Sequence, residues 1–159
     1  MDFVRLAGII RLMPRNDEAA VAQRHDLRWP LIASHDSAQG ILTPVFQLIA
    51  APDEPRERDN ANEDAISLNL DTASLFLSDR FTGYDRYEGG IRANAGISYT
   101  LLGANGGFVR TSIGESFHIA GENSFAAGSG LEGTASDLVA AVALQFNEQV
   151  TLGYQTRVE

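Results

Sequence analysis

The feature that most constrains the fold is a strict alternation of apolar and polar side chains that begins at residue 91 and lasts about eleven residues. Successive side chains point to opposite faces of a β-strand, so a period of two predicts a strand with one apolar and one polar face. About 9–11 residues is also the length of a tilted strand that crosses a bilayer. The apolar face holds Ile91, Ala93, Ala95, Ile97, Tyr99 and Leu101, and the other holds Arg92, Asn94, Gly96, Ser98 and Thr100.

The same alternation predicts further strands over 108–119, 138–146 and 150–158, although Glu115 interrupts the apolar face of the first of these. Earlier strands are predicted over 2–12, 26–34 and 41–50. Pro30 and Pro44 fall inside two of them and each removes a ladder hydrogen bond, so we expect them near strand ends or at bulges. No segment has a helical period, and seven strands result.

The predicted connections alternate in length along the chain. Those over 35–40, 103–107 and 147–149 are short, whereas those over 13–25, 51–90 and 120–136 are long. Short turns on one side and long loops on the other are typical of outer-membrane barrels. The pattern therefore predicts an all-β chain, an antiparallel up-and-down meander of about seven long strands, as an incomplete segment of a large outer-membrane β-barrel. A half-buried soluble sheet has the same alternation and stays open as an alternative.

Composition excludes some classes of protein. The net charge of −9 argues against a nucleic-acid partner. No run approaches the ~18 apolar residues of a membrane helix, and the first residues do not have the pattern of a signal peptide. Hydropathy alone would therefore indicate a cytoplasmic protein, but it overlooks barrel strands, whose alternation averages to neutral. The chain has no cysteine, and all twelve basic residues are arginine.

The charge is concentrated in one segment, 53–90, which holds ten acidic residues and four arginines. It ends in RFTGYDRYEGGIR, residues 80–92, where opposed charges alternate with glycines and aromatics just before the strand at 91. Glycine allows the tight turns that such a segment needs. We predict an ion-pair network that orders a long loop, formed by Arg80, Gly83, Asp85, Arg86, Glu88, Gly90 and Arg92.

These acidic residues also suit two other uses. A carboxylate pair drawn from Asp79, Asp85 and Glu88 would suit a glycan-active β-protein, but neutralisation by the neighbouring arginines is favoured. The loop over 53–71 could bind a divalent cation, although it lacks a spaced ligand motif. The three histidines are scattered, and GANGG has no following lysine or helix. No catalytic residue, metal site or cofactor is therefore predicted.

Most of the chain from about residue 26 onward resembles one family. Three short stretches match this family: TPVFQLIAAP at 43–52, GESF at 114–117 and SGLEGTASDLVA at 129–140. Leu68 and Leu70 depart from positions where the family tends to have an aromatic. The chain is similar to the LPS-assembly protein family LptD, also called the organic solvent tolerance protein family, at Asn62, Glu63, Asp64, Asp71, Leu75, Phe76, Arg80, Phe81, Gly83, Asp85, Arg86, Glu88, Gly90, Arg92, Ala93 and Gly96.

The resemblance implies a function in lipopolysaccharide assembly. The family's barrel has about 26 strands and an LptE-type plug lipoprotein in its lumen, and a periplasmic jelly roll receives lipopolysaccharide from the Lpt bridge. Glycan passes through the lumen and lipid A leaves sideways between the first and last strands. The resemblance then implies no catalysis, and a polar lumen wall here that includes Asn94, Ser98, Arg110, Ser112, Ser116 and His118.

We expect residues 1–159 to form one partial barrel domain from the middle of the wall, without the signal peptide, jelly roll, cysteines or gate strands of the family. The short turns would face the periplasm, and the loop over 51–90 would lie outside or over the lumen. The expected location is the outer membrane of a Gram-negative bacterium, with outer-membrane lipid, lipopolysaccharide and the plug as partners. Another outer-membrane porin or transporter is the alternative.

Overall fold

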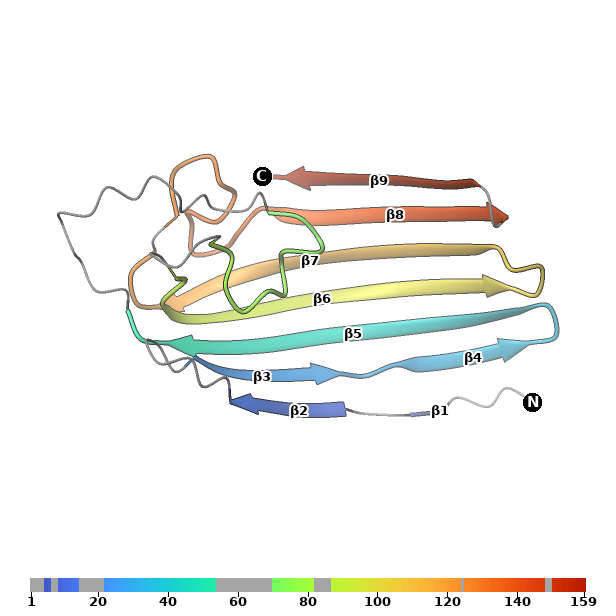
Figure 1. The fold of residues 1–159 in the computed structure, drawn as a ribbon, viewed down its shortest axis with the longest axis horizontal. Helices are drawn as coiled ribbons and strands as arrows, with labels where there is room; N and C mark the ends of the chain where they lie inside the picture. Colours follow the sequence, from blue (N-terminus) through green and yellow to red (C-terminus); the bar gives the residue numbers. More distant parts are fainter. Residues whose placement is uncertain are drawn as a thin grey trace.

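The computed structural model describes residues 5–6, 9–14, 22–53, 70–81, 87–123, 125–147 and 150–159. These residues form one antiparallel β-sheet without a helix (Figure 1). No helix long and apolar enough to cross a membrane occurs among them. The strands are β1 (Arg5–Leu6), β2 (Ile9–Pro14), β3 (Gln23–Arg28), β4 (Leu31–His35), β5 (Ala38–Ala51), β6 (Gly90–Gly103), β7 (Phe108–Ala120), β8 (Leu138–Asn147) and β9 (Val150–Val158).

The all-β antiparallel meander predicted from the sequence is confirmed, but two of the seven predicted strands are each divided in two. β3 and β4 both pair with β5, so they are halves of the strand predicted over 26–34. β1 pairs with β4 and β2 pairs with β3, so β1 and β2 are the two halves of the strand predicted over 2–12. From β5 to β9, each strand pairs with its sequence neighbour, and the sheet is open at both edges.

The two prolines explain the break between β3 and β4. Pro30 lies in the break, at a strand end as predicted. Pro44 lies in the middle of β5, opposite Ile97, so its predicted place at a strand end or bulge is wrong. The backbone N–H of Trp29 donates to the Pro44 carbonyl at 3.1 Å. In an antiparallel sheet, the N–H and C=O of one residue point to the same neighbouring strand. A residue with an N–H at position 44 would therefore direct it toward the break between β3 and β4, where the ladder is interrupted.

The connections alternate in length, as predicted, and sort to opposite ends of the sheet (Figure 1). β4, β6 and β8 end, and β5, β7 and β9 begin, at one end of the sheet, which we call the short-turn end. β2, β5 and β7 end, and β3, β6 and β8 begin, at the other, the long-loop end. In the turn after β6 the Gly103 N–H donates to the Gly107 carbonyl at 2.8 Å, and Gly106 has a φ of 83° that favours glycine.

The register gives the sheet two different faces. The inner face carries the row Asp26, Gln47, Asn94 and Ser116, which are consecutive cross-strand partners. The outer face carries large apolar side chains that remain exposed, more than a soluble monomer usually shows; they include Phe46, Ile97, Tyr99, Ile113, Phe117, Leu138, Leu152 and Tyr154.

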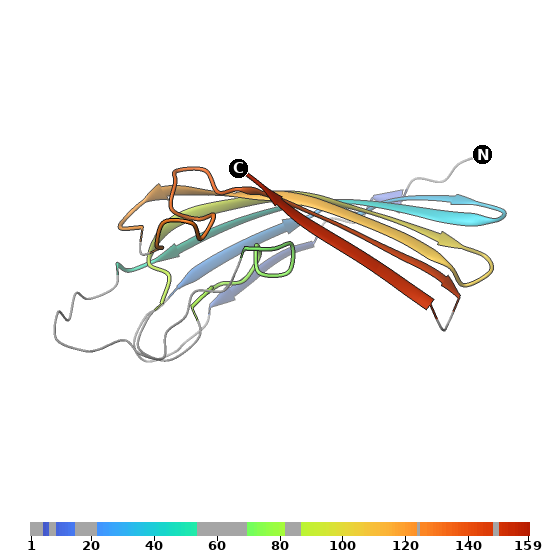
Figure 2. The same cartoon turned by 90° about the horizontal axis from the view of Figure 1, so that it is seen from above.

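The buried apolar core lies on the inner face, at its long-loop end. Leu70 and Leu75 come from the segment that precedes β6, Leu131 from the segment that precedes β8, and Val139 from β8 itself. Phe76 and Phe125 pack against this cluster. Figure 2 shows the segment 70–81 lying against one face of the sheet. The inner face is therefore covered at one end and uncovered toward the short turns.

We expect Leu42→Pro to destabilise the sheet and Pro44→Ala to leave it nearly unchanged. Leu42 is the cross-strand partner of Leu31, so a proline there removes a ladder bond at a cost of about 1–3 kcal/mol. The N–H regained by Pro44→Ala faces the existing break. Thermal unfolding of the folded protein, followed by circular dichroism in detergent, measures both. Equal losses in the two variants would contradict this account of the break.

Candidate functional site

The segment over the inner face begins with one tight helical turn. The Leu75 N–H donates to the Asp71 carbonyl at 3.0 Å. The Asp71 carboxylate accepts from the N–H groups of Ala73 and Ser74, and the Asp71 N–H donates to the Ser74 hydroxyl at 2.8 Å. These reciprocal bonds outweigh the effect of partial burial and hold the pKa of the Asp71 carboxyl below its usual value. The turn is thereby ordered and directs Leu75 and Phe76 toward the sheet.

A pair of glycines on the sheet receives these two side chains. Gly96 of β6 and Gly114 of β7 are direct cross-strand partners. A Cβ on Gly96 would lie 2.9 Å from Phe76 Cζ, and a Cβ on Gly114 would overlap Leu75 Cδ2. Glycine at these positions therefore forms a recess that allows the close approach of the segment to the sheet. We call residues 70–81 and 87–89 the inner-face loop.

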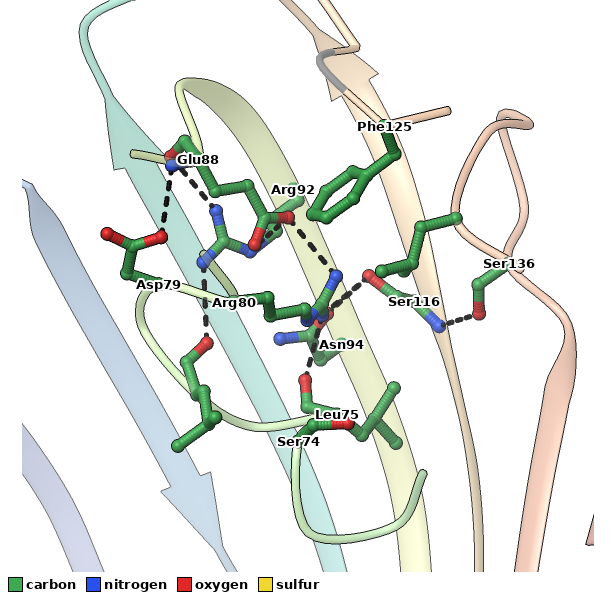
Figure 3. A network of polar contacts seen from close by, with 12 residues as sticks. Ser74, Leu75, Asp79, Arg80, Glu88, Arg92, Asn94, Ser116, Phe125 and Ser136 are labelled. Atoms are coloured by element: carbon green, nitrogen blue, oxygen red, sulfur yellow. Dashed lines mark hydrogen bonds and ion pairs between the residues drawn. The ribbon is translucent and has the colours of Figure 1, made fainter. Parts of the chain in front are cut away.

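Two arginines and one glutamate form a buried ionic cluster between the inner-face loop and the sheet (Figure 3). Arg80 Nη1 lies 3.1 Å from Glu88 Oε1, and Arg92 Nε lies 3.2 Å from the same oxygen. The side chains of Arg80, Arg92 and Glu88 are 1%, 2% and 8% exposed. Charges removed from water this completely are costly unless they are paired, so the three groups depend on one another. We call them the Arg–Glu–Arg cluster.

Burial governs the electrostatics of this cluster. It raises the pKa of the Glu88 carboxyl and lowers that of the Arg80 guanidinium, while the opposite charges counteract both shifts. The Asp79 carboxylate accepts from the Phe81 and Glu88 N–H groups at 3.0 and 3.2 Å. Its negative charge balances part of the excess positive charge of the two arginines. Through these two bonds Asp79 connects the two described parts of the inner-face loop, 70–81 and 87–89.

The cluster is continuous with a row of polar side chains that crosses the sheet. Gln47 Nε2 donates to Asp26 Oδ1 at 2.8 Å, and the Asn94 amide donates to Gln47 Oε1. The Ser116 hydroxyl donates to Asn94 Oδ1 at 2.6 Å, and Arg80 Nη2 donates to both Asn94 and Ser116. The bonds among Asp26, Gln47, Asn94 and Ser116 each join neighbouring strands, so these side chains brace one another across β3, β5, β6 and β7.

The sheet and the cluster bind the inner-face loop chiefly through its backbone. Arg80 donates to the Leu75 carbonyl at 2.8 Å, and Gln47 donates to the Phe76 carbonyl at 3.1 Å. Arg92 donates to the carbonyls of Leu77, Ser78 and Glu88. Backbone carbonyls in a buried irregular segment need partners. Arginine and glutamine supply them here, so a loop without regular structure remains satisfied against the sheet.

The segment before β8 completes the cover over the inner face. The Phe81 and Phe125 rings stack at 4.8 Å between centroids. Ser136 accepts from the Ser116 N–H at 2.9 Å and so fastens this segment to β7. Arg157 of β9 pairs with Asp137 at 3.1 Å and donates to the Ser129 carbonyl at 3.0 Å. The two long segments and four strands are thus joined at the long-loop end.

Of the network predicted over 80–92, the structure brings Arg80, Glu88 and Arg92 together. Gly90 begins β6 with a φ of 83°, and a Cβ there would lie on the Ala120 carbonyl oxygen. That close approach and the left-handed backbone both favour glycine. Gly83, Asp85 and Arg86 lie outside the described residues.

The six side chains expected to line a lumen share the inner face, since Asn94, Ser98, Arg110, Ser112, Ser116 and His118 follow the register of β6 and β7. Two of them differ from the expected wet surface. Asn94 is fully buried and Ser116 nearly so, because the inner-face loop covers them. Ser98, Arg110 and Ser112 lie toward the short-turn end, beyond the loop. His118 lies at the other end and contacts the Gly121 carbonyl at 3.1 Å.

Sequence reasoning missed Arg24, Asp26 and Gln47 as members of the site. Arg24 pairs with Asp26 at 2.7 Å and so holds the carboxylate that Gln47 binds. Gln47 is a polar residue inside the apolar run 45–50, which was a signal for a buried partner. Arg24 precedes residue 26, the predicted start of its strand, so the alternation pattern assigned it to neither face of the sheet.

The alternative uses of the acidic residues gain no support from the described geometry. The Asp79 and Glu88 carboxylates are both engaged by loop N–H groups or arginines, and Asp85 lies outside the described residues. Most of the acidic segment 53–71 is also outside them. Among the residues that are described, no group of three or more His, Asp or Glu side chains is placed to hold a metal ion.

Glu88→Ala should detach the inner-face loop, because it leaves Arg80 and Arg92 buried without their counter-ion. Breaking a buried ion pair typically costs about 3–5 kcal/mol. Asp137→Ala is the matched control, since its partner Arg157 is 36% exposed and a surface pair contributes about 0–1 kcal/mol. Limited proteolysis of the folded protein reports loop release. Equal protease resistance of Glu88→Ala and the parent protein would refute the role of the cluster.

Gly114→Val should also displace the loop, by filling the recess that Leu75 occupies. Gly153→Val is the control on the same face of β9, where the nearest atom to an added Cβ is 4.0 Å away. Overpacking of this kind costs about 1–3 kcal/mol. Hydrogen exchange of residues 70–81, measured by mass spectrometry, should rise in Gly114→Val alone. If Gly153→Val raised it as much, the recess would not be the cause.

Comparison with known proteins agrees with this architecture. A family model described as LPS transport system D, LptD, matches residues 20–157. No curated protein and no solved structure matches the chain. Members of the matching family are outer-membrane proteins of Gram-negative bacteria with a role in lipopolysaccharide transport. The match covers the sheet from β3 to β9 and both long segments over its inner face, and leaves out β1 and β2. This chain therefore belongs to the LptD family.

Proposed function

We propose that this chain forms part of the wall of the outer-membrane translocon that inserts lipopolysaccharide into the outer leaflet. Family membership supports transport of this glycolipid. The observation that carries the finer proposal is the inner-face loop, which is bound to a polar sheet face by the buried Arg–Glu–Arg cluster. Such a loop acts as an ordered seal over one end of the lumen.

The outer face suits contact with outer-membrane lipid. Its exposed side chains in β6 to β9 are predominantly apolar or aromatic, among them Ile97, Ile113, Leu152 and Tyr154. Barrel strands alternate apolar side chains toward lipid with polar ones toward the lumen. The strands β5, β6 and β7 have 13 or 14 residues, which is long enough for a tilted crossing of the hydrocarbon core.

The inner face suits the passage of a saccharide at its short-turn end. Ser98 and Ser112 offer hydroxyl groups there without the cover of the loop. Many weak, exchangeable hydrogen bonds hold a moving sugar without a deep energy minimum. At the long-loop end the buried row below the loop is dry and fixed. We infer that glycan meets a wet wall first and then an ordered loop.

This proposal sets an orientation and partners. The short turns face the periplasm and the long loops face outward, as in outer-membrane barrels. The substrate is lipopolysaccharide, delivered from a periplasmic Lpt bridge, and a plug lipoprotein of LptE type occupies part of the lumen. The chain does no chemistry on its cargo in this proposal, and the energy for transport is supplied elsewhere in the machine.

We expect Arg80→Ala, introduced into the protein in its own cells, to weaken the outer-membrane barrier. Arg80 is held by Glu88, Leu75, Asn94 and Ser116, so its loss frees the loop. Surface lipopolysaccharide should fall and entry of large antibiotics should rise, each about several-fold, at matched protein levels. Ser78→Ala is the control, because only the Ser78 backbone carbonyl contacts Arg92. Normal lipopolysaccharide display and a normal barrier in Arg80→Ala would contradict the proposal.

A further inference from the structure

Two arginines differ from the other described arginine side chains. Arg24 pairs with Asp26, Arg80 and Arg92 pair with Glu88, and Arg157 pairs with Asp137. Arg28 and Arg110 are exposed, and neither has a carboxylate within ion-pair distance among the residues that the structure describes. Within the described part of the chain, the contacts of Arg110 are neutral: a long hydrogen bond of 3.3 Å to the Thr100 hydroxyl and a position 5.5 Å from the Phe108 ring centroid.

These two arginines line the same cavity. It has a volume of about 350 Å³, and its lining includes Gly96, Ser98, Ser112 and Phe76. A second cavity of about 500 Å³ shares Thr72, Arg110 and Ser112 with it. The shared residues join the two cavities into one groove on the inner face. The groove starts where Phe76 of the inner-face loop ends the cover, and it extends across β7 to β8 and β9.

The register fixes how far apart the two arginines are. Arg28 lies in one cross-strand row with Val45, Gly96 and Gly114, and Arg110 lies four residues along β7 from Gly114. Strand spacing gives a lateral separation of about 14 Å and an offset along the strands of about 13 Å between the two backbones. Long side chains that extend from these positions leave room between them for a small saccharide rather than for a bare phosphate ion.

The surroundings of the groove favour an anionic ligand. The nearest carboxylate on the strand of Arg28 is Asp26, which Arg24 and Gln47 already bind. The Asp71 carboxylate, which precedes the lining residue Thr72, is engaged by the Ala73 and Ser74 N–H groups. Arg28 interacts with the Asp26 charge at longer range, but neither it nor Arg110 forms an ion pair among the described residues. In a chain of net charge −9, the groove is a local cationic site. Leu75 and Phe76 occupy the Gly96–Gly114 recess, but the Ser98 and Ser112 part of the floor has small side chains that leave room for a sugar ring.

We propose that Arg28 and Arg110 form a binding site for an anionic sugar, a saccharide that carries a phosphate or carboxylate group. The two guanidiniums flank the saccharide and bind its acidic groups through charge-assisted hydrogen bonds, and the Ser98 and Ser112 hydroxyls contact the ring. Both arginines are solvent-exposed, so binding is weak and reversible, as a transport path requires. This site rests on the proposed function, because it places the saccharide on the inner face.

Binding can be measured with the complete protein, purified with its native partners in detergent. The probe is a fluorescently labelled core oligosaccharide from the lipopolysaccharide of the same cells, followed by anisotropy. The doubly substituted Arg28→Gln, Arg110→Gln protein should bind about tenfold more weakly or worse, since each charge-assisted bond contributes strongly. Arg28→Lys with Arg110→Lys should fall between, because lysine keeps the charge but loses the fork geometry. Thr111→Ala, on the outer face of β7, should bind normally.

Treated probes distinguish the two sources of negative charge. If phosphate is recognised, phosphatase treatment of the oligosaccharide weakens binding and reduction of its carboxyl groups does not. If a sugar carboxylate is recognised, the reverse holds. Equal binding of both treated probes and the untreated one would overturn the proposal, as would normal binding by the glutamine double variant.

A second measurement separates this site from the function on which it rests. A photo-crosslinking residue at position 98 in living cells should capture lipopolysaccharide in the parent protein, and capture should drop in the glutamine double variant. Unchanged capture in that variant would overturn the arginine site and leave the transport function intact. No capture in the parent protein would contradict passage of glycan along this face. Capture of an acidic protein in place of lipopolysaccharide would overturn the site as a sugar site.

Discussion

The structure depends on three buried charged side chains, whose desolvation cost is offset by their pairing with one another. Glu88 lies between Arg80 and Arg92 at 3.1 and 3.2 Å, and each of the three is too deeply buried to stand alone. Arg92 belongs to the sheet, whereas Arg80 and Glu88 belong to the inner-face loop. The cluster is thus the junction between regular and irregular structure. Both arginines also donate to loop carbonyls, so one set of charges both holds the loop and satisfies part of its backbone.

The sheet can carry this junction because its two faces are separated by the strand period. Polar side chains on the inner face meet their cross-strand partners in rows, and the row Asp26, Gln47, Asn94 and Ser116 becomes a hydrogen-bonded brace under the cluster. The adjacent row contains Gly96 and Gly114, which admit Leu75 and Phe76. One row is therefore polar and fixed and the next is a recess. Together they divide the inner face into a covered end and an open groove.

Much of the architecture followed from local pattern. The alternation at 91–101 predicted β6 and its faces, and the glycine-rich turn at 103–107 predicted the hairpin to β7. Pro30 ended a strand as its missing N–H requires. Pro44 does not end a strand, because it faces the break between β3 and β4, where a ladder bond is already missing. The local sequence around Pro44 carries no information about a break in the neighbouring strand. Asn94 was expected to face water, since a polar residue on an alternating strand carries no sign of a loop that will cover it.

The sequence by itself determined the strands, their two faces, the alternation of short and long connections, and membership of the LptD family. These depend on side-chain period, turn chemistry and motif, all of which are local. The tertiary structure decided which charges are paired. Arg80 meets Ser116 across 36 residues and Asn94 meets Gln47 across 47, distances along the chain that only the register brings together. It also decided that Arg28 and Arg110 share a groove in which no described carboxylate lines the wall, because a charge is free or paired only by virtue of what the fold places beside it.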